Sequence, residues 1–348
     1  MIFHQRPGVY SDYDASSVTA TGAAQRIVAL IGASAVDAGV YTLSSYASAK
    51  ETFGEESQLA KMLKLAYENG AGTVMVYPVA NDSAQTYAAA VAAILQEKKA
   101  NYLVLGAVSE TVQTAAKAAV EAAAGQKGEC IAFCGMGAAT SAQLIARAEA
   151  LNSERMVLLA PQVYLTGEDT LSDGCMAAAA LAGALCASYD PAEPLNGQIL
   201  RGLSGVGAIY DDTAYDALAN AGVTVLECEG GEVSVIRALT TRTQTGGVSD
   251  LTYRELSTMR IIDEVIPTLR TALRSRFTRA KNNAVTRKAI YNQVVLELED
   301  RVAREIIDGY DNLRVAADST DRTVCVVEFE FTVVQGLSRI HLTAHVQV

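Results

Sequence analysis

Between residues 26 and 161, short apolar runs alternate with amphipathic segments, and this alternation constrains the fold more than any other feature of the chain. Most of the amphipathic segments carry Ser, Thr or Asp near the start, as helix caps require. Continuous apolar strands that alternate with helices predict a largely parallel sheet covered on both faces. The apolar runs are residues 26–32, 73–79, 101–107, 129–135 and 155–161, and the helical segments are residues 57–70, 83–99, 109–125 and 140–152.

The pattern continues through an Ala-rich helix at 173–188 and strand-like runs at 206–210 and 222–228. A polar, Gly-containing stretch at 240–252 then indicates a loop or boundary. Beyond it the sequence predicts two helices and three antiparallel strands, which together form an α+β unit. The helices are expected at 252–277, with a kink or break at Pro267, and at about 284–308, ending at Gly309; the strands are expected at 312–317, 323–334 and 339–348.

The predicted fold class is therefore α/β plus α+β: a central, largely parallel α/β sheet domain followed by a C-terminal helix–helix–strand domain. A chain of 348 residues is too long for one small core and suits such a division. The expected boundaries are an N-terminal arm that joins the C-terminal domain (1–25), the α/β domain (26–235), the C-terminal domain (236–335) and a terminal strand (336–348).

The final strand alternates strictly between apolar and polar residues, which predicts one buried face. Chain ends are usually frayed unless something holds them, so a sheet edge must receive this strand. The residues alone leave open whether that edge belongs to the same molecule. The apolar positions are Ile340, Leu342, Ala344, Val346 and Val348.

Composition and the N-terminus bear on where the protein works. Half of the residues are apolar, yet no apolar run approaches the roughly 20 residues that span a bilayer. The first residues contain no apolar core of a secretory signal. The sequence therefore predicts a protein made and kept in the cytoplasm, with no membrane contact.

The sequence gives little support for a catalytic or metal-binding site. The only histidines are His4, His341 and His345, so a Ser-His-Asp or Cys-His arrangement would need a histidine from a chain end. Cys130 and Cys134 have a C-x3-C spacing, but no second pair follows at zinc-site spacing. The cysteines are expected to be buried, reduced thiols. No catalytic residue, cofactor or metal site is predicted.

One segment leaves a cofactor alternative open. Gly135 and Gly137 follow a strand-like run and precede a helix, which is the context of a dinucleotide-binding turn. Thr140 replaces the third Gly, and the run is the fourth of the series instead of the first. A tight turn without a ligand is the favoured interpretation, and a nucleotide-binding α/β enzyme is the alternative.

Charge is distributed unevenly. Residues 1–240 carry 13 basic and 25 acidic side chains (13 − 25 = −12), and residues 241–348 carry 15 and 14 (15 − 14 = +1). A basic run lies between Glu264 and Glu297, where no acidic residue occurs, and it predicts an anionic partner. Nucleic acid fits this run by charge, so a nucleic-acid-binding protein is a further alternative, but the aromatic and Gly signals of RNA and single-strand binders are missing. An acidic protein surface fits the run as well. The run consists of Arg270, Arg274, Arg276, Arg279, Lys281, Arg287 and Lys288.

Both ends of the chain resemble a known family. The sequence RPGVY at 6–10 resembles the opening of contractile-tail sheath proteins, and the region from about 235 through VCVVEFEFTVV to the final strand is similar to their C-terminal domain. The likeness covers about the first ten and the last 115 residues. The α/β middle is compatible with the variable central domain of that family.

The resemblance implies a structural protein that is not an enzyme. Such a protein forms stacked rings, commonly of six subunits, around a tail tube, and contracts to drive the tube through a cell envelope. Residues 26–235 would form the outer wall, residues 236–335 would face the tube, and the basic run would contact an acidic tube surface. The implied partners are other copies, the tube, and baseplate and tail-terminator proteins, in a phage or bacteriocin tail assembled in the host cytoplasm.

The resemblance also implies that both chain ends pair with strands of neighbouring subunits. Main-chain bonds would then link the lattice. The residues expected in this linkage are Arg6, Pro7, Gly8, Val9 and Tyr10 at the N-terminus and the five apolar positions of the terminal strand.

Overall fold

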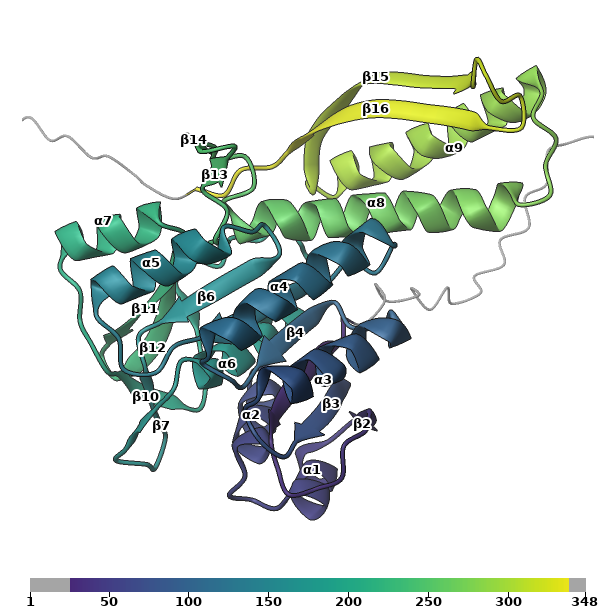
Figure 1. The fold of residues 1–348 in the computed structure, drawn as a ribbon. Helices are drawn as coiled ribbons and strands as arrows, with labels where there is room; N and C mark the ends of the chain where they lie inside the picture. Colours follow the sequence, from purple (N-terminus) through teal and green to yellow (C-terminus); the bar gives the residue numbers. More distant parts are fainter. Residues whose placement is uncertain (1–25, 338–348) are drawn as a thin grey trace, which may run out of the picture.

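A computed structural model describes residues 26–337, and its centre is a nine-stranded sheet (Figure 1). Its six inner strands are mutually parallel, which confirms the predicted α/β architecture. Antiparallel strands complete both edges. In spatial order the strands are β2 (Tyr41–Leu43), β3 (Val74–Val79), β1 (Val28–Ala33), β4 (Tyr102–Leu105), β5 (Ile131–Gly135), β6 (Met156–Ala160), β11 (Val223–Glu229), β12 (Glu232–Arg237) and β9 (Gln198–Ile199).

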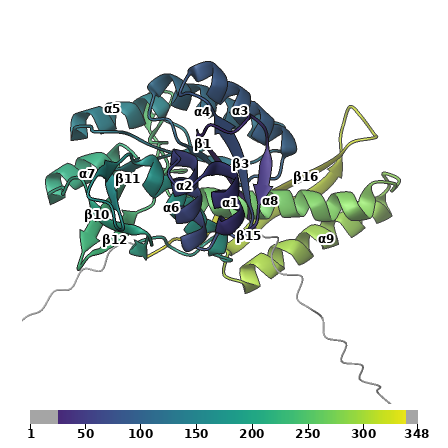
Figure 2. The same cartoon turned by 90° about the horizontal axis from the view of Figure 1, so that it is seen from below.

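Helices cover both faces of the sheet, as the apolar runs predict (Figure 2). Successive strand residues point to opposite faces, so Val28 and Leu30 pack in one apolar cluster and Ala29 and Ile31 in the other. The first cluster lies under α1 (Tyr46–Phe53), α2 (Gln58–Glu68) and α6 (Cys175–Ala187); the second lies under α3 (Ala84–Glu97), α4 (Glu110–Gly125), α5 (Ser141–Leu151) and α7 (Asp212–Asn220).

The Ala-rich composition of α6 follows from how closely it packs. Nearly every residue of this helix is buried. At Gly183 a Cβ atom would lie 2.4 Å from the carbonyl oxygen of Ala66 in α2. The small side chains of α6 therefore allow α2 and α6 to pack in direct backbone contact.

Two predicted elements differ in the structure. Residues 207–210 are not a strand: β10 (Leu203–Val206) ends earlier and joins β7 (Val163–Leu165) and β8 (Leu171–Ser172) in a small sheet. The chain then turns to Asp211, which caps α7. The second C-terminal helix, α9 (Ala284–Ala303), does not reach Gly309, because Glu305 has a left-handed φ of 57° that ends it.

The C-terminal part consists of two long helices and a β-hairpin that extend beyond the sheet (Figure 1). Helix α8 (Leu256–Phe277) runs without interruption through Pro267, so the predicted break is wrong. Strands β15 (Ile307–Ala317) and β16 (Cys325–Val333) pair antiparallel, as predicted, and pack on α8 and α9. A short hairpin of β13 (Gln244–Thr245) and β14 (Val248–Ser249) occupies the predicted boundary stretch.

Candidate functional site

The basic run does not form one continuous surface. Arg270 points from α8 toward the α/β domain and makes a two-pronged contact with Glu129, with Nη2–Oε1 and Nη1–Oε2 distances of 2.8 and 3.3 Å. Burial is the largest single influence on Glu129 and would raise its pKa. The hydrogen bonds and positive charge of Arg270, a backbone hydrogen bond and the charge of Arg155 together outweigh burial and lower the pKa below its usual value. Arg270 therefore has a counterion 141 residues away, which the sequence did not indicate.

The remaining cations of the run lie toward the far end of α8 and the start of α9. Arg276 donates a hydrogen bond to the buried side chain of Gln293, and Arg287 donates one to Asn282 Oδ1 at 3.0 Å. Asn282 also donates to two carbonyl oxygens of the β15–β16 turn, which brings Arg322 to the same end of the molecule. We call this end the basic tip; it comprises Arg276, Arg279, Lys281, Arg287, Lys288 and Arg322.

The exposed members of the run lack acidic partners. Within residues 26–337, no salt bridge involves Arg274, Arg279, Lys281 or Lys288. All four are exposed. Their charges are therefore available to a partner.

Helix α8 is fixed to the α/β domain along its first half by further ionic contacts. Arg155 Nη1 lies 2.5 Å from Asp263 Oδ2, and Arg26 Nη2 lies 3.6 Å from Glu264 Oε2. Burial raises the pKa of Asp263 above its ordinary value, although Arg155 opposes this shift. Arg260 adds hydrogen bonds to the Ser188 hydroxyl and to the carbonyl oxygens of Asp190 and Glu193.

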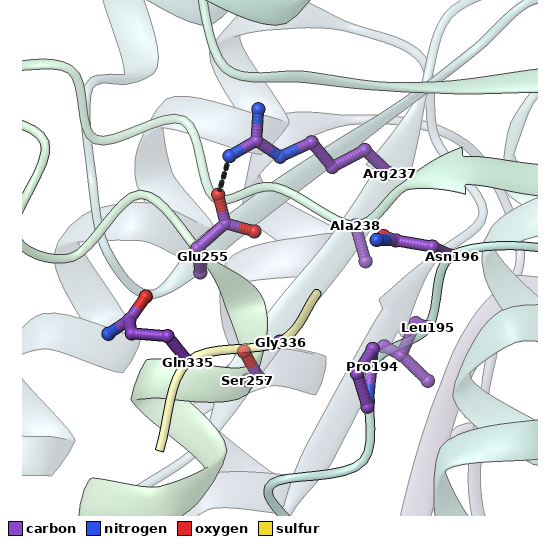
Figure 3. A pocket seen from close by; sticks show the side chains of 9 residues that line it. All are labelled: Pro194, Leu195, Asn196, Arg237, Ala238, Glu255, Ser257, Gln335 and Gly336. Carbon is purple, nitrogen blue, oxygen red and sulfur yellow. Dashed lines mark hydrogen bonds and ion pairs between the residues drawn. The ribbon is translucent and has the colours of Figure 1, made fainter. Parts of the chain in front are cut away.

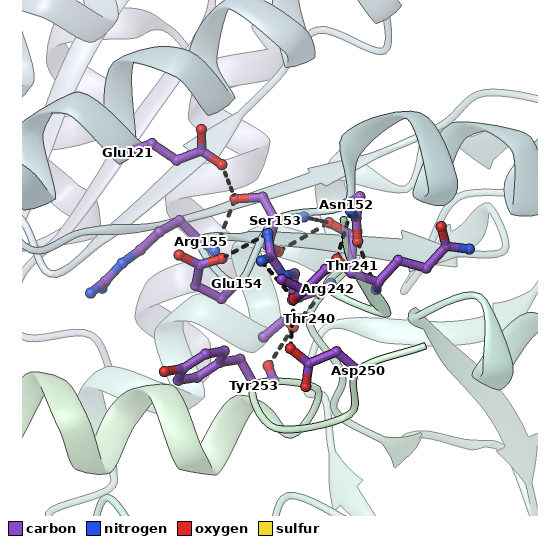
Figure 4. A network of polar contacts seen from close by, with 12 residues as sticks. Glu121, Asn152, Ser153, Glu154, Arg155, Thr240, Thr241, Arg242, Asp250 and Tyr253 are labelled. Carbon is purple, nitrogen blue, oxygen red and sulfur yellow. Dashed lines mark hydrogen bonds and ion pairs between the residues drawn. The ribbon is translucent and has the colours of Figure 1, made fainter. Parts of the chain in front are cut away.

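The predicted boundary stretch at 240–252 is also held firmly (Figure 4). Asn152 Oδ1 accepts hydrogen bonds from the backbone N–H groups of Thr243 and Gln244, both at 3.1 Å. The Thr241 hydroxyl donates to the Ser153 carbonyl and accepts from the Ser153 N–H. The connection between the two parts of the chain is thus hydrogen-bonded to the loop before β6.

The β15–β16 hairpin presents two free edges. It is a two-stranded sheet, and neither outer edge pairs with another strand among the residues that the structure describes. One face, with Val327, Phe329 and Phe331, packs toward α8 and α9, while Glu328 and Glu330 are exposed. Backbone donors and acceptors along both edges are therefore open to an added strand.

After β16 the chain crosses back over the α/β domain beside a small pocket (Figure 3). The Arg237–Glu255 ion pair forms part of the pocket wall. Gly336 lies so close to Pro194 that a Cβ atom would be 2.9 Å from the proline Cγ. The proposed arm residues at 6–10 and 340–348, and all three histidines, lie outside the described residues.

Two family models match the chain: the phage tail sheath protein central domain at residues 80–241 and the phage tail sheath C-terminal domain at residues 248–347. The chain belongs to the phage tail sheath family. The matches meet at the β13–β14 hairpin, so the hydrogen-bonded junction around Asn152 and Thr241 lies at the boundary between the two sheath domains.

Known sheath proteins give the same assignment. The tail sheath protein of Bacillus phage SP01 is 26% identical over 258 residues, which is 72% of this chain and 44% of the relative. This chain thus spans less than half of that relative's length. Solved structures share the fold at lower identity: the anti-feeding prophage sheath in the contracted state (TM-score 0.73, 19% identity, 99% of each chain) and the sheath complex of an extracellular contractile injection system, PVC, in the contracted state (0.73, 14%, 100% of this chain and 99% of that chain).

The sheath assignment disfavours the nucleotide-binding alternative, and packing accounts for the residues that suggested it. A Cβ at Gly135 would lie 2.2 Å from the backbone of Gly174 at the start of α6, so this glycine is needed for packing. Thr140 forms a capping box with Gln143 at the start of α5. The strand order of the sheet reverses between β1 and β4. At this position the Gln58 side chain accepts a hydrogen bond from the Ala33 N–H and donates one to the Gly106 carbonyl oxygen.

Other chemistry is sparse in the described part of the sheath chain. No cluster of three metal-ligating His, Cys, Asp or Glu side chains occurs within residues 26–337. Burial raises the pKa of four cysteines to about 12, which keeps them as unreactive thiols. No helix between residues 26 and 337 combines the length and hydropathy of a membrane span. The four cysteines are Cys130, Cys134, Cys175 and Cys186.

Proposed function

We propose that this chain is a structural subunit that polymerises as stacked rings, with six subunits per ring, around a tail tube. The sheath contracts from a metastable extended state and drives the tube through a cell envelope. Contraction then needs no catalysis, because the extended state already holds the energy that is released when the subunits repack. Assembly takes place in the host cytoplasm, with baseplate and tail-terminator proteins at the two ends of the sheath.

The free edges of the β15–β16 hairpin carry this proposal. The hairpin packs on α8 and α9 through one face, but both of its long edges stay open among residues 26–337, and such edges are usually covered. Strands from the chain ends of neighbours would cover them, with a net gain of about 0.5–1.5 kcal/mol for each main-chain hydrogen bond. Several bonds per subunit would link the lattice while the globular bodies change their contacts.

The basic tip supports a tube-facing orientation of the C-terminal domain. We propose that residues 236–335 face the tube and that residues 26–235 form the outer wall. Exposed ion pairs contribute only about 0.2–1 kcal/mol each, so a set of them can hold the tube in the extended state and release it on contraction. Arg279, Lys281 and Lys288 are the best candidates, because they are exposed and have no acidic partner within residues 26–337.

Electron microscopy of the purified full-length protein tests the polymer. We expect tubes or rings in negative stain, and we expect a variant that lacks residues 338–348 to remain a folded monomer by circular dichroism and sedimentation. Persistently monomeric wild-type protein, or unchanged tubes from the shortened chain, would contradict the proposal.

The tube contact has its own test. Reversing Arg279, Lys281 and Lys288 to Glu should reduce sheath assembly on tubes. A variant with the same charge change at Lys50, Lys64 and Lys117 in the α/β domain is the matched control. Equal assembly by both variants would remove the tube-facing role of the tip.

A further inference from the structure

A second basic surface lies apart from the tip, in a cleft between α8 and the α/β domain. The cleft has a volume of about 390 Å³ and is bordered by the α3–β4 loop, the α4–β5 loop and the part of α8 from Asp263 to Arg274. Its two carboxylates, Glu129 and Asp263, are already engaged by Arg270 and Arg155. The cations that line it are Lys98, Lys99, Lys127, Arg270 and Arg274.

Most of this positive charge has no counterion within the described chain. Arg270 is paired with Glu129, and Lys99 forms an exposed pair with Glu97, whereas Lys98 donates to the Gln126 carbonyl. Lys127 and Arg274 have no salt bridge among residues 26–337. An anionic group that enters this cleft would meet several cations at once.

The opposite edge of the sheet has the opposite charge. The loops that border the cleft precede β4 and β5, so they lie at the amino ends of the parallel strands. The loops that directly follow β1, β3, β4 and β5 contain no Lys or Arg, and they include Asp37 and Asp82. Asp173 lies between β6 and α6, and Asp211 lies just before α7; Glu168, in the β7–β8 turn, is paired with Lys61. The carboxyl edge of the sheet therefore carries mainly negative charge, whereas the cleft at the amino edge carries mainly positive charge.

The β11–β12 turn adds two exposed carboxylates, Glu229 and Glu232, at that carboxyl edge. Glu229 and Glu232 face each other across the hairpin, on either side of Gly230 and Gly231. Both glycines have positive φ, 59° and 87°, as a two-residue hairpin turn requires. Like charges directly opposite each other destabilise a hairpin, and neither glutamate has a basic partner in residues 26–337. A cationic partner outside the molecule would relieve this repulsion.

We propose that the cleft of one copy receives the Glu229–Glu232 turn of a second copy. The cleft lies at the amino ends of β4 and β5 and the turn at the carboxyl end of β11, on opposite edges of the same sheet, so a copy cannot fill its own cleft. A contact between different surfaces of identical chains is heterologous, and it builds either a closed ring or an open helical polymer. The inference rests on the proposed sheath function, and it adds a link between α/β domains that does not depend on the chain ends.

Charge exchange in the full-length protein tests the contact. Lys98→Glu with Lys127→Glu, and separately Glu229→Lys with Glu232→Lys, should each raise the protein concentration needed for tube formation about tenfold, because attraction becomes repulsion at exposed pairs. The four-site variant, and an equimolar mixture of the two double variants, should assemble near the wild-type concentration. Lys64→Glu with Lys117→Glu is the matched control for net charge, and its threshold should not change.

The outcomes separate this inference from the proposed function. If the wild type forms tubes and both double variants form them at the same concentration, only the cleft contact is refuted. If the cleft variant needs a higher concentration to form tubes and the four-site variant needs the same higher concentration, the cleft binds something else and the proposal is overturned.

If the wild type forms no tubes, the sheath function fails, and the contact is tested by carbodiimide cross-linking of the oligomers formed at high concentration. Mass spectrometry should then find Lys98 or Lys127 joined to Glu229 or Glu232. The absence of these links, with other inter-subunit links present, would refute the contact.

Discussion

Replacing Arg155 with Met should destabilise the protein strongly, because Arg155 is the counterion of a carboxylate that is mostly buried. The side chains of Arg155 and Asp263 are 9% and 17% exposed, and they join the amino end of β6 to α8. Asp263 Oδ1 is buried and has no hydrogen-bond partner among the described residues. The substitution would leave this carboxylate without the contact that compensates for its burial.

The expected cost is about 3 kcal/mol of unfolding free energy at neutral pH. Removing one member of a buried pair typically costs about 3–5 kcal/mol, and the residual exposure here favours the lower value. Replacing both members with apolar side chains removes the unpaired charge as well. The double variant Arg155→Met, Asp263→Leu should therefore recover most of the loss.

The cost should also depend on pH. Because burial raises the pKa of Asp263, the folded chain keeps a proton there at pH values where the unfolded chain has lost it. Stability from this group is therefore fully present below the unfolded pKa and falls as pH rises toward the folded pKa. Without Arg155 the folded pKa rises further, so the penalty of Arg155→Met should be smaller at pH 5 than at pH 8.

Urea unfolding of the monomer at both pH values measures these differences. Three results would refute the reasoning: a cost below about 1 kcal/mol, equal costs at the two pH values, or a double variant no more stable than the single one. Glu129 and Arg26 also act on Asp263, so both must stay unchanged in the comparison.

Three further predictions concern the C-terminal part. Gly336→Val should lower tube yield without unfolding the monomer, because its Cβ would press on Pro194 and displace the chain where it leaves the α/β domain; unchanged yield in negative stain would contradict this. Pro267→Ala should raise the unfolding free energy by about 3 kcal/mol, because α8 regains a backbone donor in its interior; a loss of stability in urea would contradict this. Amide hydrogen exchange in β15 and β16 should slow markedly in tubes relative to monomers, and equal exchange would show that no strand is added there.

The sequence predicts the α/β elements well because their signals are local. Apolar runs mark the inner strands, and hydroxyl side chains such as Ser57 and Ser83 mark helix starts, where they accept backbone N–H groups. Short elements carry too few residues for a periodic signal, so β8 and β9, with two residues each, could not be found. Helix α7 could have been found, because Asp211 is a recognisable cap.

The candidate surfaces are harder to predict because they join distant segments. The pairing of Arg270 with Glu129 depends on where α8 crosses the sheet, and no local pattern encodes that. The grouping of Lys98 with Lys127 had an available signal: both precede neighbouring parallel strands, whose amino ends meet at one edge. In the sequence, Lys98 and Lys127 lie far from the basic run. In the structure, they share the cleft with Arg270 and Arg274, while the rest of the run forms the basic tip.

Helix α8 connects the β15–β16 hairpin to the α/β domain, so a mechanical force on the hairpin would pass through this helix. Leu256 and Met259 pack into the apolar cluster of the α/β domain, whereas Ile261, Val265 and Leu269 pack under the β15–β16 hairpin. A strand that pulls on the hairpin would therefore load α8, and the ionic contacts of α8 would pass that load to the sheet. On β15 and β16 only Ile307 is fully buried, so fewer buried side chains hold the hairpin than hold α8, which has seven. The hairpin is also the element whose edges are open, and strands added to these edges would strengthen the subunit at the point where the lattice pulls on it.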